Sequence, residues 1–312
     1  MKTVSSLTAF VTLVFLVPIS FANVTPFQPR SLKTNLFPSG YTYTSGFTTA
    51  SGVSASGISP VSLSDSDLNV IKVTSGVTHN VVSQNGKTAW EAVYPKGSYN
   101  PSGTPKGGFG FYLGGSDKFQ TAVQGGAKQV MFGYSVMFQN GFQWNMGGKL
   151  PGGFGGIGDS AFACSGGRQT DREECFDLRL MWRSNGEGEL YAYLPLTSTN
   201  AKALSTAGPE TVLNSDYGYS VGRGSWTFPA GQWVTVAERI KMSDPYQANG
   251  EIQVWFNGNS VINVKGLEFR NTTESLIQGM HFQTFFGGST SDWASPINQK
   301  AWFADVSGAV IS

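Results

Sequence analysis

The sequence predicts an all-β protein of antiparallel strands, arranged as a sandwich or a barrel. Glycine supplies 40 of the 312 residues, close to twice its usual share of about 7%. Short runs rich in Val, Thr, Phe, Tyr and Trp alternate with clusters of Gly, Asn, Pro and Ser, which is typical of strands joined by turns. No segment after the first 22 residues keeps a 3.6-residue period, so we expect few and short helices.

The expected strands follow one another without a linker. They fall at 69–74, 90–94, 109–113, 130–138, 141–146, 176–183, 189–195, 233–241, 251–256, 261–264, 280–286 and 301–306. Residues 63–312 then suit one all-β domain, because sandwiches reach this size without splitting. Residues 23–62 are rich in Ser, Thr, Gly and Pro and show little alternation, which predicts an extended or partly disordered N-terminal segment.

Residues 1–22 have the composition of a secretory signal peptide. Lys2 is their one charge, an apolar run extends from Leu7 to Ile19, and a Ser-Phe-Ala sequence predicts cleavage after Ala22. A retained anchor is the alternative, but the run is shorter than the roughly 18 residues of a membrane span. We therefore expect a secreted, extracellular protein with no membrane partner, acting as a monomer.

The charge balance limits the kinds of partner. Cleavage would remove Lys2 from the 21 Lys and Arg residues, leaving 20 cations against 20 Asp and Glu residues. A net charge of zero argues against a nucleic-acid partner. Any anionic partner must therefore be held by a local cluster of cations.

Two cysteines, Cys164 and Cys175, are separated by ten residues. In a secreted chain this spacing predicts a disulfide. A metal site would need further ligands, and the two histidines, His79 and His281, are distant in sequence. We expect no metal and no cofactor, and no dense acidic cluster argues for calcium. Asn271, in Asn-Thr-Thr, is a predicted glycosylation site.

Two neighbouring segments alternate with a period of two, which separates an apolar face from a polar one. The predicted apolar face contains Phe176, Leu178, Leu180, Trp182, Leu190, Ala192 and Leu194. The opposite face contains Asp177, Arg179, Met181, Arg183, Tyr191 and Tyr193. The apolar face would pack in the core of the fold. The opposite face, which carries arginines, an aspartate and two tyrosines, predicts a functional site.

A five-residue loop, 184–188, would pair Arg183 with Glu189 and Arg179 with Tyr193. Such an odd-length loop places Arg179 on the same face as both tyrosines. A two-residue Asn-Gly turn would place them on opposite faces.

Lys149 is the third cation of the predicted site. Extending the expected strand 141–146 places Gln143, Asn145 and Lys149 on one face, and the glycines before Pro151 would let a ligand approach the backbone. The alternative is a turn that carries a solvated lysine.

Cations and phenols on one wall suit proton abstraction beside a carboxylate. Arg and Lys would neutralise a uronate carboxylate and stabilise the enolate-like state. A tyrosine whose pKa is depressed by these cations would be the base, and a tyrosine would return a proton to the leaving glycosidic oxygen. The product would be a chain cut by β-elimination. The alternative for the tyrosine pair is ordinary strand packing.

Several motifs, in order, resemble those of family-14 polysaccharide lyases, secreted enzymes that cleave alginate or glucuronan. They are YPKGSYNPS (94–102), GGFGFYL (107–113), GGKLPG (147–152), RLMWR (179–183), YAY (191–193) and FQTFFGGS (282–289). The resemblance covers about residues 70–310 and implies a β-jelly roll, a two-sheet antiparallel sandwich whose concave groove binds an acidic polysaccharide. By the same resemblance, Lys149, Arg179, Tyr191 and Tyr193 are catalytic.

One position departs from the family pattern. Where alginate-cleaving members resemble Ser-x-Arg, this chain has Asp177 two residues before Arg179. A carboxylate in the groove would repel a uronate, which favours a different polyuronate such as glucuronan. Asp177 could instead be a structural partner of Arg179.

Other residues are candidates for contact with the sugar. Lys96, Gln143, Asn145, His281 and Gln283 are candidate substrate-binding residues, with a plain loop lysine as the alternative for Lys96. Either histidine could serve as a base instead of a tyrosine. Tyr99, Trp226 and Trp293 could stack on sugar rings, but core packing is the favoured interpretation.

Two other functions compete with a lyase. A non-catalytic carbohydrate-binding jelly roll has the same fold. A glycoside hydrolase needs two facing carboxylates, for which Asp171, Glu173, Glu174, Glu187 and Glu189 are available. Most of these lie in the loop between the cysteines or at the hairpin turn, which argues against hydrolysis. The sequence leaves open which polyuronate is cut, endo or exo action, and which tyrosine is base or acid.

Overall fold

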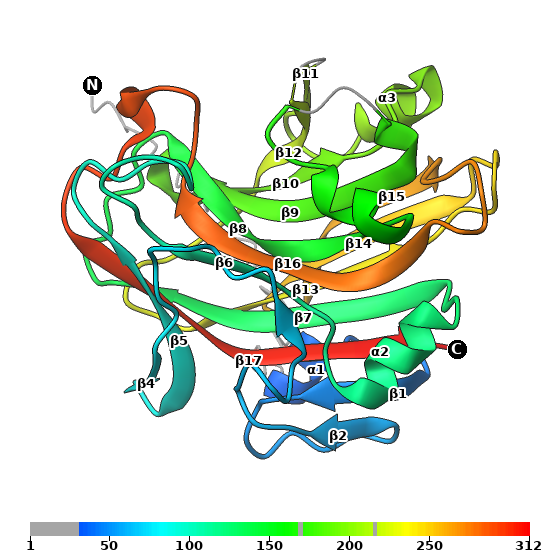
Figure 1. Cartoon of the computed structure of the whole chain (residues 1–312), viewed down its shortest axis with the longest axis horizontal. Helices are drawn as coiled ribbons and strands as arrows, with labels where there is room; N and C mark the ends of the chain where they lie inside the picture. The colour runs from blue at the N-terminus through cyan, green and yellow to red at the C-terminus, as the bar shows by residue number, and fades with distance from the viewer. Residues whose placement is uncertain (1–30, 168–170, 215–216) are drawn as a thin grey trace, which may run out of the picture.

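The computed structural model describes residues 31–167, 171–214 and 217–312, which form two stacked β-sheets. Figure 1 shows the sheets as two layers, with β9, β8 and β16 in one layer and β7 and β17 in the other. The predicted all-β sandwich is confirmed. The predicted signal peptide, 1–22, and residues 23–30 lie outside the described residues.

The first sheet has nine strands in the order β15-β14-β13-β7-β17-β1-β2, with β5 also paired to β17 and β4 to β5. Its strands are β1 (Tyr43–Thr48), β2 (Ile58–Pro60), β4 (Val81–Gln84), β5 (Lys87–Tyr94), β7 (Gln129–Phe138), β13 (Val234–Lys241), β14 (Gly250–Phe256), β15 (Asn259–Leu267) and β17 (Gln299–Ile311). The pairing is antiparallel except between β1 and β2.

The second sheet has eight strands in the order β11-β12-β10-β9-β8-β16-β6-β3. They are β3 (Val70–Ile71), β6 (Phe109–Leu113), β8 (Gly147–Gly156), β9 (Cys175–Arg183), β10 (Glu187–Tyr193), β11 (Val212–Asn214), β12 (Gly218–Thr227) and β16 (Leu276–Phe286). Within the described residues the α-helices are short: α1 (Leu32–Leu36), α2 (Asp117–Gln124) and α3 (Ser198–Leu204). None of the described helices has the length and apolar character needed to cross a membrane.

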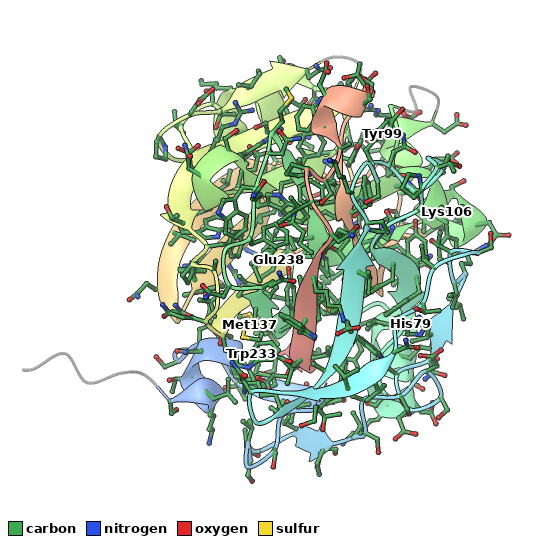
Figure 2. The ribbon with its side chains drawn as sticks, turned by 90° about the vertical axis from the view of Figure 1, so that its left-hand side faces the viewer. His79, Tyr99, Lys106, Met137, Trp233 and Glu238 are labelled. Atoms are coloured by element: carbon green, nitrogen blue, oxygen red, sulfur yellow. A yellow bond between two sulfur atoms is a disulfide. The ribbon has the colours of Figure 1, made fainter. Side chains whose placement is uncertain are left out.

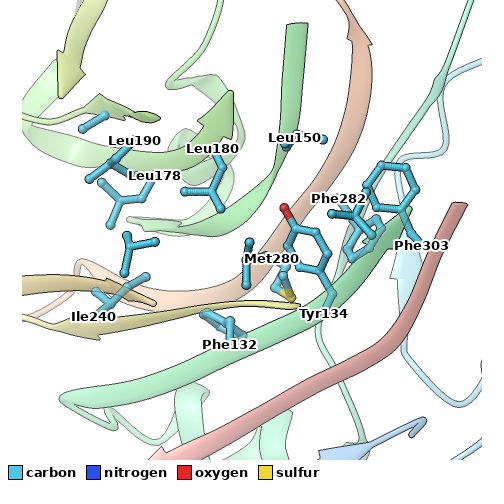
Figure 3. Close-up of a cluster of buried hydrophobic side chains, with 14 of the residues drawn as sticks. Phe132, Tyr134, Leu150, Leu178, Leu180, Leu190, Ile240, Met280, Phe282 and Phe303 are labelled. Atoms are coloured by element: carbon cyan, nitrogen blue, oxygen red, sulfur yellow. The ribbon is translucent and has the colours of Figure 1, made fainter. Parts of the chain in front are cut away.

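The main core fills the space between the sheets. Leu178, Leu180 and Leu190 from the second sheet face Phe132 and Ile240 from the first (Figure 3). All seven residues of the predicted apolar face are buried in this core. The predicted period of two is therefore correct in β9 and β10, and it turns the polar residues of both strands to the outer face.

A second cluster lies on the outer face of the nine-stranded sheet. Met137 and Trp302 are buried there, and Trp233 packs against them. Figure 2 shows Met137 and Trp233 close together, and it places Glu238 among the interior side chains. Glu238 is 4% exposed and accepts a hydrogen bond from the Gly153 N–H at 2.8 Å. An acidic side chain of the first sheet thus bonds the backbone of β8 in the second.

The N-terminal segment contributes more order than its composition predicts. Residues 31–62 include α1 and β1, and β1 pairs antiparallel with β17. Buried Leu36 and Phe37 form a small cluster with Ala309 of β17. Residues 31–62 were expected to be extended or partly disordered. Their strand β1 instead joins the nine-stranded sheet, because β17 offers it a backbone partner.

The expected strand 141–146 is wrong, since these residues form turns and an irregular segment, and β8 begins at Gly147. The proline in this segment is compatible with a strand, because β8 contains a bulge between Lys149 and Gly152. Pro151 lies in the bulge, where its missing N–H is not needed. A Cβ atom on Gly152 would lie 1.9 Å from the Leu178 carbonyl oxygen, so only glycine fits this close approach of strands.

The hairpin between β9 and β10 has a tighter turn than predicted. Arg179 pairs with Tyr191, not with Tyr193, because the turn consists of the three residues 184–186. Asn185 and Gly186 have φ of 61° and 78°, the left-handed conformations that a three-residue hairpin loop uses. The register shifts by two residues, so the predicted face is unchanged.

Candidate active site

A cleft of about 570 Å³ lies on the outer face of the eight-stranded sheet. Strands β8, β9, β10 and β12 contribute its floor. It is lined by Asn100, Pro101, Lys149, Gly166, Arg179, Met181, Arg183, Tyr191, Tyr193, Val212, Asn214, Tyr217, Gly218, Ser220, Arg223, Phe285, Gly287, Gly288, Ser289 and Trp293. The structure therefore brings together all four predicted catalytic residues.

Lys149 occupies the centre of this group. Its Nζ lies 3.0 Å from the centre of the Tyr191 ring and 6.0 Å from that of Tyr193. Nζ also lies 2.9 Å from Sδ of Met181, its partner across β8 and β9. The side chain is buried, so the alternative of a solvated lysine is wrong. Burial, followed by the nearby Arg179 and Arg183, holds the pKa of Lys149 well below its ordinary value.

The two tyrosines are adjacent on β10, with ring centres 5.4 Å apart. Burial raises the pKa of Tyr191, and the neighbouring Tyr193 raises it further. Burial also raises the pKa of Tyr193, although Arg179 and the backbone N–H of Gly166 offset part of this effect. The expectation of a tyrosine with a depressed pKa is therefore wrong, because loss of water outweighs the attraction of the cations.

Arg179 is held from two sides. Its guanidinium donates to Oε1 of Gln283 at 2.7 Å, and its Nε lies 3.3 Å from Oδ2 of Asp177. The same carboxylate oxygen is 2.7 Å from Nδ1 of His281. Burial lowers the pKa of His281 below its ordinary value, although Asp177 acts in the opposite direction.

Asp177 does not line the cleft. It is 3% exposed and lies behind Arg179 as its ion-pair partner. His281 and Gln283, two of the predicted substrate-binding residues, lie beside Arg179 at a second cavity. The structural interpretation of Asp177 therefore fits the geometry, and the carboxylate that seemed to oppose a uronate is already paired.

Two further arginines lie in the cleft, and neither was among the four predicted catalytic residues. Arg183 and Arg223 both pair with Glu189, at 2.6 and 3.1 Å, and Ser220 donates to the same carboxylate at 2.6 Å. Glu189 is fully buried. Burial opposes its ionisation, but the hydrogen bond and charge of Arg183 outweigh burial and lower its pKa. The period of two already placed Arg183 beside Arg179, whereas Arg223 lies in β12, which was not expected to be a strand.

The predicted disulfide is present and borders the site. Cys164 and Cys175 are bonded, with Cα atoms 5.7 Å apart. Both cysteines form a buried cluster with Tyr193, and Tyr191 packs against it. The loop that follows Cys164 supplies Gly166 to the cleft wall. The disulfide thus fixes a wall of the cleft next to Tyr193.

Several predicted binding residues lie elsewhere or have other partners. Lys96 and Gln143 are exposed and do not line the cleft, and the Gln143 backbone bonds both ends of the Gln299 amide. Asn145 donates to the carbonyls of Asp292 and Ala294, at 2.8 and 2.7 Å. The direct roles predicted for Lys96, Gln143 and Asn145 are therefore not supported by the geometry.

Through these two bonds Asn145 holds the loop that carries Trp293. Trp293 lines the cleft, so the expectation that it packs in the core is wrong. Trp226, by contrast, is buried in the core. His79 bonds Asp65 at 2.9 Å and packs against Phe111, and it is not part of the cleft. Asn271 is exposed, as a glycosylation site must be.

The cleft walls carry no acidic side chain among the described residues. Asp171, Glu173, Glu174 and Glu187 lie outside the lining, and Glu189 lies beneath it with both oxygens bonded. A glycoside hydrolase would need two carboxyl groups facing the substrate. In the same described part of the chain, no group of three His, Cys, Asp or Glu residues comes together as a metal site would require.

The chain resembles known proteins in sequence and in fold. The family described as Polysaccharide lyase 14 matches residues 82–306. The comparison with curated proteins gave no match. The PL-14 alginate lyase of the marine Aplysia kurodai is 32% identical with a TM-score of 0.61, covering 78% of this chain and 87% of that one. The alginate lyase vAL-1 from Chlorella virus is 24% identical with a TM-score of 0.63, covering 78% and 93%. A mutant of the alginate lyase Aly36B in complex with an alginate tetrasaccharide is 19% identical with a TM-score of 0.59, covering 86% and 97%.

Proposed function

Because this chain belongs to polysaccharide lyase family 14, we propose that it cleaves a polyuronate by β-elimination in the cleft over β8, β9 and β10. The observation that carries the proposal is the meeting of Lys149, Arg179, Tyr191 and Tyr193 in one cleft that no carboxylate of the described residues lines. Such a wall is attractive to an acidic sugar and supplies both a proton acceptor and proton donors.

The charges of the site suit one uronate carboxylate. Arg179, Arg183 and Arg223 line the cleft, whereas their partners Asp177 and Glu189 are buried and do not line it, and Arg223 also contacts the half-exposed Glu210. The substrate would therefore meet guanidinium groups at the cleft wall. These groups would neutralise the substrate carboxylate and lower the energy of the enolate-like state.

The pKa shifts reverse the roles that the sequence suggested. Lys149, whose pKa is lowered, is the better proton acceptor, and Tyr193, whose pKa is raised, keeps its proton and serves as the donor. Lys149 takes the C5 proton, the electron pair forms the C4=C5 double bond, and the C4–O bond breaks. The leaving oxygen takes the Tyr193 proton. A proton passing from the Lys149 ammonium to the Tyr193 phenolate restores the site, and no water is consumed.

Alginate is the first substrate to test. Asp177 is paired with Arg179 and is absent from the cleft lining, so it gives no reason against alginate. The 32% identical relative is an alginate lyase. Glucuronan is the second arm of the test, since its uronate carboxylate has the same chemistry.

One assay separates the candidate functions. The protein is incubated with alginate, polymannuronate, polyguluronate and glucuronan while ultraviolet absorbance and reducing ends are followed. β-Elimination yields an unsaturated, absorbing uronate end together with each reducing end. Hydrolysis would yield reducing ends without absorbance, and a binding protein would yield neither; both results would contradict the lyase.

We also propose that the protein is secreted after cleavage between Ala22 and Asn23. The apolar run of residues 7–19 and the disulfide Cys164–Cys175 support this proposal. When the full chain is expressed in a secretory host, the protein recovered from the culture medium should begin at Asn23. Retention of Met1 in a cell-associated protein would contradict it.

A further inference from the structure

A second cavity, of about 200 Å³, adjoins the cleft. The two share Pro101, Gly166, Arg179 and Phe285 as lining residues, so they are neighbours, with Arg179 at their boundary. His281 and Gln283 line the second cavity and not the cleft. A polymer that fills the cleft would therefore extend into this space.

Lys72 lies on the wall of the second cavity, immediately after β3. Its backbone has φ of 53°, in the left-handed region that a lysine seldom adopts. Ile71 pairs with Tyr112 of β6, which fixes the lysine next to the groove. Backbone strain of this kind persists only where the surroundings impose it, and it is frequent at ligand sites.

The charge of Lys72 is available to a ligand. The side chain is exposed, and Nζ lies 4.4 Å from the centre of the Phe162 ring. Among the described residues it has no acidic partner within ion-pair distance, whereas Lys87, Lys241 and Lys300 each pair with a carboxylate. Phe162 holds the ammonium by a cation–π contact without neutralising it.

The other polar groups of the second cavity do not supply a free cation. Arg179 is shared with the cleft and is already bonded to Gln283 and Asp177. His281 is bonded to the same aspartate and stacks on Tyr112, with ring centres 4.2 Å apart. Every sugar of a polyuronate carries a carboxylate, so a second sugar in the groove needs a second cation.

We propose that the second cavity binds the uronate that follows the one held at Arg179, one sugar away from the cleaved bond, and that Lys72 pairs with its carboxylate. Gln283 lies on the same wall and contacts Arg179, so the two sugars are held by one connected set of side chains. This inference rests on the proposed lyase function and adds a specificity residue to it. Lys72 acts on binding, and the chemistry stays with Lys149 and Tyr193.

The test compares K72Q and K72R with a matched control, K265Q. Lys265 is an exposed lysine of β15 in the other sheet. The value of kcat/KM is measured for a size series of uronate oligomers and for polymer, at low and high salt. K72Q should lower kcat/KM by about fivefold on long chains, mostly through KM, since one charge-assisted contact is lost. The shortest cleaved oligomers should be unaffected.

The conservative variant and the control sharpen the result. K72R should keep the activity on long chains, K265Q should match the wild type, and the salt dependence of KM should weaken in K72Q. Equal values for K72Q and K265Q at every length, or the same loss at every length, would overturn the proposal while leaving the lyase intact. A wild type that gives no unsaturated product from any polyuronate would instead overturn the proposed function and this inference with it.

Discussion

The Lys149 Nζ lies 3.0 Å from the centre of the Tyr191 ring, and its hydrogen-bond partner is the sulfur of Met181. A buried amine with an aromatic face and a thioether for neighbours is poorly solvated as an ammonium ion. Arg179 and Arg183 add repulsion. This relationship suits a proton acceptor, and it leads to predictions on pH and on stability.

The activity should depend on the proton of Lys149. Because its pKa is well below 10.5, kcat/KM should rise with pH as the ammonium deprotonates, and it should reach a plateau below 10.5. K149R keeps a permanent charge and should show no activity at any pH. A pH profile of kcat/KM checks this expectation. If K149R were active and its kcat/KM rose with pH as in the wild type, that rise would belong to a group other than Lys149.

The same lysine should make the fold less stable at low pH. The unfolded chain binds the Lys149 proton below about 10.5, whereas the folded chain releases it. The stability contributed at this position therefore falls as pH decreases from 10.5 to the folded pKa. K149M should have a larger free energy of unfolding in urea than the wild type. Above pH 10.5 this difference should shrink to the part that comes from the different packing of methionine and lysine. A gain independent of pH would show that Lys149 is not the source.

Tyr193 should be the proton donor. Y193F removes the phenol but keeps the ring against the Cys164–Cys175 cluster, so the fold should survive and the rate should fall by about 10²–10⁴-fold. Y191F is the matched control, and its loss should be smaller. The rate of appearance of unsaturated product is measured alongside thermal unfolding. A larger loss in Y191F than in Y193F would exchange the two roles.

Glu189 should stabilise the cleft floor through Arg183 and Arg223. E189Q leaves these two guanidiniums without their buried carboxylate, and the free energy of unfolding should fall by about 3 kcal/mol. E210Q is the control, since Glu210 is a half-exposed partner of Arg223 and its loss should change little. Urea unfolding measures both variants, and equal losses would contradict the anchoring role.

Glu238 should titrate between the sheets. Burial raises its pKa well above 4.5, so the folded chain keeps a proton that the unfolded chain loses. Stability should therefore fall as pH rises from about 4.5 to the folded pKa. E238Q, which can still accept the Gly153 N–H bond, should lose this slope, and E238L should be destabilised by about 1–3 kcal/mol at an unpaired backbone group. A slope that persists in E238Q would point to another group.

Local pattern was enough to predict the two faces of β9 and β10. The period of two separated Leu178 and Leu180 from Arg179, and it turned Tyr191 toward the same side as that arginine. The register was wrong by two residues because the turn is stabilised by left-handed Asn185 and Gly186, which composition alone does not distinguish from a longer loop. A shift by an even number of residues leaves the faces unchanged.

The strand that carries Lys149 could not be predicted in the same way. GGKLPGG contains residues that usually end strands, and it forms β8 because β9 and β16 approach it too closely for larger side chains. Arg223 and Trp293 likewise enter the cleft from segments with no helical or strand signal of their own.

The amino-acid order by itself determined the sandwich, the apolar faces and the common face of Arg179, Tyr191 and Tyr193, because a strand's alternation is a property of neighbouring residues. Only the tertiary structure decided the direction in which the pKa values of Lys149 and the two tyrosines shift. Desolvation depends on everything that surrounds a side chain, so the burial that lowers the Lys149 pKa and raises those of the tyrosines appears only when both sheets and the disulfide loop are assembled.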